Sequence, residues 1–201
     1  MKVRNKPACC RRHHRQTFAN PAALKARLKP CHHELHNKSL RLALAGMLCG
    51  VAVVGSMISF PVFSSKCAPV QHMVNVLAGV ALGPLYALGM AFCASLIRNL
   101  LGLGSLLAFP GSMCGALLCG LLWRKTGRLP AAVLGEIIGT GLIGGLLAYP
   151  VAVAFMGVNA GAVAYYAYVV PFLVSTAVGA GLSGLVLSAM LRSGLLKKFI
   201  G

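Results

Sequence analysis

The feature that most constrains this chain is a run of 55 residues, Ile137–Leu191, without a charged side chain. Three more uncharged runs precede it: 24 residues at Leu42–Ser65, 31 at Cys67–Ile97 and 25 at Asn99–Trp123. A helix needs about 20 apolar residues to cross the hydrocarbon core of a bilayer, and soluble domains rarely go so long without a charge. These runs predict an all-α integral membrane protein.

Composition supports that class and excludes others. Of the 201 residues, 58% are hydrophobic and 10% are charged, and the acidic residues number two, Glu34 and Glu136. Aspartate-led magnesium sites and paired-carboxylate glycosidase chemistry therefore lack their residues. A nucleophilic enzyme is disfavoured because His72 is the single histidine outside the N-terminal arm and no GxSxG motif accompanies it. We expect neither enzymatic activity nor a cofactor in this chain.

Glycines and prolines divide the apolar runs into spans. Gly83-Pro84 separates two short spans within residues 70–103, and a cluster of glycines near Asn159 divides the longest run. The expected spans then cover residues 40–60, the two parts of 70–103, 111–123, 131–155 and 166–191. Six spans place the later basic clusters on the same side as the basic N-terminus, as the positive-inside rule requires. The prediction is a six-helix bundle with both termini cytoplasmic.

The two ends of the chain differ from the membrane domain expected at residues 40–192. Residues 1–39 read as a flexible basic arm attracted to anionic lipid, and residues 193–201 as a short basic tail. Nucleic-acid binding is disfavoured because no aromatic platform accompanies the charge. The arm's cysteines and histidines could ligate zinc, but their spacing matches no standard finger, so we predict no metal site.

Glycines four residues apart recur inside the spans. They allow helix backbones to approach closely, and they occur as Gly46/Gly50, Gly111/Gly115, Gly135/Gly139 and Gly141/Gly145. The segment 139–144 also fits the GxGxxG dinucleotide pattern, but that pattern needs a preceding strand and here lies in an apolar helix. The glycines therefore predict a compact bundle and no nucleotide site.

Polar side chains within spans are costly in lipid, so each indicates a partner or a cavity. They are His72, Asn75, Arg98, Asn99, Glu136 and Thr140. We expect a structural role for Glu136, placed toward the cytoplasmic half and far from any pocket. Five aromatic residues gather near the outer ends of the last two spans, as an interfacial belt or as the wall of a ligand pocket. These are Tyr149, Tyr165, Tyr166, Tyr168 and Phe172.

Three segments resemble a known family when taken together: residues 66–76 (KCAPVQHMVNV), 98–112 (RNLLGLGSLLAFPGS) and 135–141 (GEIIGTG). They are similar to the ThiW family, the substrate-binding S components of energy-coupling-factor (ECF) transporters for the thiazole precursor of thiamin. The resemblance covers residues 40–192 and does not extend to the arm. The Ala-xxx-Ala pair typical of the first helix of S components is replaced here by Gly46/Gly50 and Ala45/Cys49.

The resemblance implies a function and a set of residues. The chain would bind hydroxyethylthiazole at the extracellular side of a prokaryotic cell membrane and deliver it with a coupling subunit and two ATPases, which use the ATP. Residues 61–70 would form a lid. Expected substrate-binding residues are Gln71, His72, Asn75, Arg98, Asn99, Ser112, Tyr149, Asn159 and Tyr165. Expected contacts with the coupling subunit are Ala45, Gly46, Cys49 and Gly50. Two alternatives stay open: an S component for another small vitamin precursor, and a structural membrane subunit without a ligand.

Overall fold

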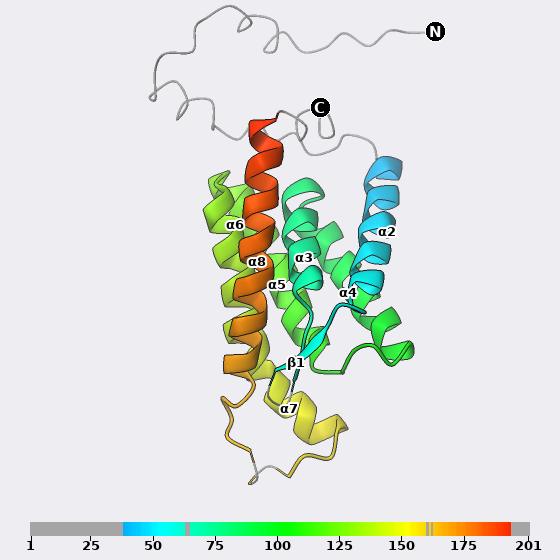
Figure 1. The fold of residues 1–201 in the computed structure, drawn as a ribbon, viewed down its shortest axis with the longest axis vertical. Coiled ribbons are helices and arrows are strands. Elements are labelled where there is room, and N and C mark those ends of the chain that lie inside the picture. Colours follow the sequence, from blue (N-terminus) through cyan, green and yellow to red (C-terminus); the bar gives the residue numbers. More distant parts are fainter. Residues whose placement is uncertain (1–37, 63–64, 160, 162, 194–201) are drawn as a thin grey trace, which may run out of the picture.

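The computed structural model describes residues 38–62, 65–159, 161 and 163–193, and most of these residues are helical (Figure 1). The helical fold predicted from the apolar runs is therefore confirmed. A short antiparallel hairpin, which the sequence analysis did not predict, joins the first two helices. In chain order the elements are α2 (Lys38–Gly55), β1 (Phe60–Val62), β2 (Ser65–Cys67), α3 (Pro69–Ala81), α4 (Pro84–Leu100), α5 (Ala108–Thr126), α6 (Leu129–Glu136), the π-helix η2 (Ile137–Gly144), α7 (Gly145–Phe155) and α8 (Val169–Arg192).

Proline and glycine set the helix boundaries. Pro69 and Pro84 begin α3 and α4, where the missing backbone N–H of proline costs no helical hydrogen bond. Gly83 between them has a φ of 87°, and Gly127 after α5 has a φ of 62°. Both values lie in the left-handed region that glycine adopts without a steric penalty. The break predicted at Gly83-Pro84 is confirmed.

Three helices in the described residues are long and apolar enough to cross a membrane. They are α2, the first part of α8 and a single 27-residue helix in which α6, η2 and α7 follow one another without a break. Within that long helix, η2 has the wider winding of a π-helix, in which each N–H bonds to the carbonyl five residues before it.

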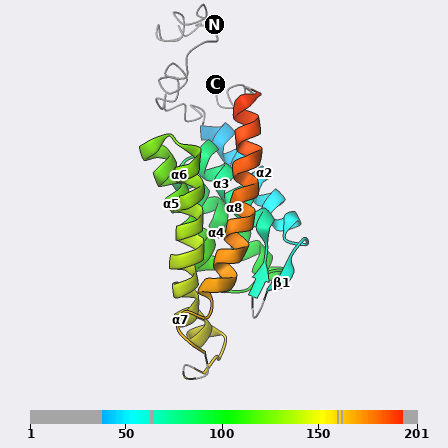
Figure 2. The same cartoon turned by 60° about the vertical axis from the view of Figure 1, so that its left-hand side comes forward.

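The helices lie side by side and alternate in direction, so that each end of the bundle has its own composition (Figures 1 and 2). The hairpin, the segment 101–107 and α7 lie at one end. The start of α2, the junction of α5 with α6 and the end of α8 lie at the other. Basic residues gather at this second end: Lys38, Arg41, Arg124, Lys125, Arg128 and Arg192.

Glycine allows α5 and the long helix to touch backbone to backbone. A Cβ placed on Gly139 would lie 2.7 Å from the carbonyl oxygen of Cys114, and one on Gly135 would lie 2.9 Å from that of Leu118. Gly141 meets the side chain of Leu173 on α8 in the same way, at 2.5 Å. These contacts are the close approach that the glycine pairs of the last spans predicted.

Candidate ligand-binding site

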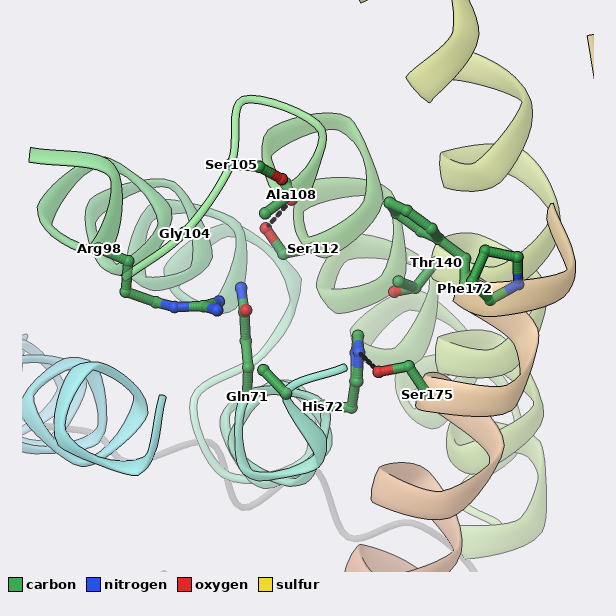
Figure 3. A pocket seen from close by; sticks show the side chains of 12 residues that line it. Gln71, His72, Arg98, Gly104, Ser105, Ala108, Ser112, Thr140, Phe172 and Ser175 are labelled. Carbon is green, nitrogen blue, oxygen red and sulfur yellow. Dashed lines mark hydrogen bonds between the residues drawn. The ribbon is translucent and has the colours of Figure 1, made fainter. Parts of the chain in front are cut away.

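A small polar cavity lies near the end of the bundle that carries the segment 101–107 (Figure 3). Its volume, measured as the space open to the centres of water molecules, is about 40 Å³. That is room for roughly three waters. All three segments singled out in the sequence contribute to its wall. The lining residues are Ala68, Gln71, His72, Arg98, Gly104, Ser105, Ala108, Ser112, Thr140, Pro171, Phe172 and Ser175.

One wall is a chain of hydrogen bonds that joins α3, α4 and α5. Gln71 Nε2 donates to Ser95 Oγ at 3.4 Å, and Ser95 Oγ lies 2.8 Å from Ser112 Oγ. Ser112 Oγ in turn donates to the carbonyl oxygen of Ala108 at 2.8 Å. Because Ser112 donates its single hydroxyl proton to that carbonyl, Ser95 is the donor between the two serines. The chain holds Gln71 and Ser112 in fixed positions at the cavity.

Beneath the cavity, the carboxylate of Glu136 joins α3 to the long helix. Its Oε1 lies 3.1 Å from His72 Nδ1 and accepts from Asn75 Nδ2 and Thr140 Oγ1, both at 3.0 Å. Glu136 is fully buried. The expectation that Glu136 lies far from any pocket is therefore wrong, since two of its partners, His72 and Thr140, line the cavity. The short helix α3 is what brings His72 down to the level of Glu136.

The ring of His72 has a partner on both nitrogens. Nδ1 faces Glu136, and Nε2 lies 3.1 Å from Ser175 Oγ on α8 (Figure 3). The imidazole ring and the Ser175 hydroxyl can each donate or accept, so these two contacts engage both ring nitrogens whichever tautomer is present. The order serine–histidine–carboxylate is that of a hydrolase triad. In this chain the same contacts fix the ring of His72 and the hydroxyl of Ser175 at the cavity wall.

Arg98 projects from the last turn of α4 toward Gln71, across the cavity from Thr140 and Phe172 (Figure 3). Its residue is 3% exposed. Its Nε and Nη1 find no hydrogen-bond partner among the described residues. The guanidinium is thus a buried charge that faces the cavity without a counter-ion in the described part of the chain.

The segment that follows α4 closes over Arg98. The backbone N–H groups of Leu103 and Gly104 both donate to the carbonyl oxygen of Arg98, at 2.9 and 3.1 Å. Asn99 Nδ2 donates to the carbonyl oxygens of Ser95 and Ser105, at 2.9 and 3.1 Å. Asn99 therefore anchors this segment and does not itself line the cavity, while Ser105 does.

Comparison with known families finds one match. Residues 42–193 match the family described as thiamine-precursor transporter protein (ThiW). The chain belongs to the ThiW family. The resemblance inferred from the three segments is thereby confirmed, and this ThiW protein is a membrane transporter for a thiamine precursor. Comparison with curated proteins and with solved structures finds no match.

The structure separates the residues expected to bind substrate in the ThiW protein into two groups. Gln71, His72, Arg98 and Ser112 line the cavity, with Asn75 and Asn99 directly behind its wall. The others lie outside its lining. Tyr149 and Tyr165 pack against each other with ring centroids 5.0 Å apart, and Asn159 is exposed.

Sequence reasoning did not predict the serines Ser105 and Ser175 or the ring of Phe172 as site residues, and it assigned Thr140 no ligand contact. Phe172 belongs to the aromatic cluster described above, but its place in the wall of this cavity was not predicted. Ser175 carried no signal of its own, since serine is common in helices that pack closely in membranes.

Three of the expected contacts with a coupling subunit, Ala45, Gly46 and Cys49, line one open groove beside α2. Ala45 and Cys49 are also buried in the core that α2 shares with α3 and α4. Their contact with a coupling subunit stays a prediction. Gly46 and Gly50 have no atom within 4 Å of the place where a Cβ would lie. An open apolar groove of about 540 Å³ runs between α2 and α4, and Gly46, Tyr86 and Gly89 line part of it.

No group of three or more metal-ligating side chains occurs in the described ranges. The cysteines and histidines of the arm, for which we predicted no metal site, lie outside them.

Proposed function

We propose that this ThiW protein is the substrate-binding S component of an ECF transporter in a prokaryotic cell membrane. It binds a thiazole precursor of thiamin, hydroxyethylthiazole, from the extracellular side. A membrane coupling subunit and two ATPases, which use the ATP, complete the transporter. The observation that carries the proposal is the convergence of three separate sequence segments on one polar cavity.

The distribution of charge supports an extracellular position for the cavity. Basic residues collect at the opposite end of the bundle, and the positive-inside rule assigns that end to the cytoplasm. The alternating helices then form six spans with both termini cytoplasmic. α3 has 13 residues, about 20 Å of helix, and is shorter than the hydrocarbon core. It packs among α2, α5 and α8, so protein rather than lipid surrounds its ends.

The wall chemistry suits a small flat heterocycle. Phe172 offers a ring face, and Gln71 and Ser112 offer hydrogen-bonding groups at fixed positions. The cavity has room for about three waters, which is less than a substituted thiazole ring needs. Binding therefore requires the site to open, and the segment 101–107 and the hairpin, at the same end, are the elements that would move.

Calorimetry on the purified chain in detergent, with neither ATP nor partner subunits, tests this function. We expect hydroxyethylthiazole to bind, and we expect Gln71→Ala and His72→Ala to weaken binding by about 1–3 kcal/mol each. Lys125→Gln, an exposed residue at the opposite end, serves as the control with unchanged affinity.

Two outcomes would replace the assignment. Binding of a different vitamin precursor, with none of hydroxyethylthiazole, would favour an S component of other specificity. The absence of any small-molecule ligand in native mass spectrometry of the folded chain would favour a structural membrane subunit.

A further inference from the structure

We propose that the ligand which this site is built for carries an anionic group, a carboxylate or a phosphate, and that the guanidinium of Arg98 binds it inside the cavity. The inference rests on the proposed function and specifies its substrate class: an acidic thiazole derivative in preference to the neutral alcohol.

The guanidinium of Arg98 is a buried charge whose removal from water is not compensated by the described residues. Arg98 is 3% exposed, and two of its guanidinium nitrogens, Nε and Nη1, have no partner in the described ranges. Removing a charge from water is costly unless an opposite charge and hydrogen bonds compensate for it. Glutamine or methionine would fill a similar volume without that cost. An arginine at this position is explained if its counter-ion arrives with the ligand.

Among the described residues, no carboxylate pairs with Arg98. It has two acidic residues, of which Glu34 lies outside the described ranges. The other, Glu136, holds His72, Asn75 and Thr140 with one oxygen. His72 and Thr140 line the cavity and Glu136 does not, so these two side chains stand between its carboxylate and the cavity. An anion in the cavity is therefore separated from the one described acid.

Other hydrogen-bond donors line the cavity that Arg98 faces. Ser105 lines the same cavity on the side of Ala108 and Ser112, and the amide of Gln71 faces the guanidinium (Figure 3). Gln71 Nε2 uses one proton on Ser95 and retains a second. A planar guanidinium matches the geometry of carboxylate and phosphate oxygens better than an ammonium does, because it can donate two parallel hydrogen bonds.

The experiment compares three ligands on the full chain in detergent: hydroxyethylthiazole, its phosphate ester and a thiazole carboxylate of similar size. We expect at least one anionic ligand to bind the wild type about 10- to 100-fold more tightly than the neutral alcohol. The phosphate and carboxylate arms distinguish the two anion classes. Arg98→Met should abolish the preference, and Arg98→Lys, which keeps the charge but loses the planar fork, should retain part of it.

Lys125→Gln is the matched control, since it removes one positive charge at the other end of the bundle and should leave the preference intact. Thermal unfolding of each variant confirms that it is folded. If the wild type binds the neutral alcohol as tightly as both anions, the inference is overturned while the proposed function stands. The same holds if Arg98→Met leaves an anion preference unchanged. If the folded wild type binds none of the three thiazoles, the proposed function fails and the inference fails with it.

Discussion

The edge helix α2 and the helices around the cavity differ in how much of their surface is buried and in the polarity of the side chains that they bury. Of the membrane-length window in α2, 11% is buried inside the protein, against 39% for the long helix of α6, η2 and α7 and 39% for α8. The polar residues of the site lie on α3, α4, α5, the long helix and α8 and in the segment 101–107, and the described part of α2 contributes none. The groove beside α2 is apolar, whereas the wall of the cavity is hydrogen-bonded.

The difference shows what holds each region together in lipid. Apolar exposure on α2 costs little there, because the surrounding lipid tails are as apolar as its side chains. Polar groups inside the bundle are costly unless they form hydrogen bonds with one another. Glu136 and its three partners therefore join α3 to the long helix, and Asn75 and Thr140 also reach carbonyl oxygens of α5. The helix α2 has no part in this network.

The largest loss of stability is expected from substitution of Glu136, at the centre of the buried hydrogen-bond network. Glu136→Leu removes the acceptor shared by His72, Asn75 and Thr140 and leaves His72 Nδ1 buried without its partner. Asn75 and Thr140 keep only their contacts with carbonyl oxygens of α5, at 3.4 and 3.1 Å. We expect it to lower the free energy of unfolding by about 3–5 kcal/mol, measured by denaturant titration in mixed micelles. Glu136→Gln, which keeps the shape and one acceptor oxygen, should lose less.

Leu134→Ala on the same helix is the control, because Leu134 is exposed and its truncation should change stability by less than about 1 kcal/mol. Wild-type stability in Glu136→Leu would show that the buried network does not hold the helices together.

A smaller effect is expected from adding one methyl group at a helix contact. Gly139→Ala places its Cβ 2.7 Å from both the carbonyl oxygen of Cys114 and the Cα of Gly115, and neither backbone atom can turn away. We expect a loss of about 1–3 kcal/mol in the same unfolding assay. Gly46→Ala makes the same chemical change on α2 where nothing lies within 4 Å, so we expect no loss. Equal losses in the two variants would contradict the distinction between packed and open glycines.

The smallest effect on the solitary chain is expected where α2 is open. Gly46→Leu and Gly50→Leu should leave its unfolding and its ligand binding unchanged, because both positions face free space. If this face docks the coupling subunit, the same variants should abolish co-purification with it and ligand uptake by cells.

Ala45→Leu, one residue away but buried, is the matched comparison and should destabilise the chain itself. Normal partner binding by both glycine variants would assign the docking surface to another helix.

The overall fold was largely predictable because it follows from one-dimensional signals. Uncharged runs predict helices, and the pair Gly83-Pro84 predicts a break, since each acts through local backbone chemistry. The hairpin of residues 60–67 was not predictable, because its strands are three residues long and lie in a loop with no alternating pattern.

The site was predictable only in part, for a reason of distance along the chain. His72 and Glu136 are 64 positions apart, and His72 and Ser175 are 103 apart, so no periodicity connects them. Glu136 was misplaced because the depth of a residue was judged from its position in its own helix. α3 is short and begins close to His72, which lets the histidine reach the level of Glu136. Residue type identified the polar candidates, and tertiary packing decided which of them meet.

The π-helix η2 makes the long helix intolerant of changes in length. One residue of an α-helix corresponds to a rotation of about 100° and a rise of 1.5 Å. The wider winding of η2 turns less per residue, so replacing it by ordinary winding over the same eight residues would turn everything after it relative to everything before it. Glu136 would keep its place while Ala148 and Ala152 left theirs against Tyr168 and Phe172. For this stretch, the winding of the helix and the number of residues between two contacts decide which side chains meet, in addition to the identity of each residue.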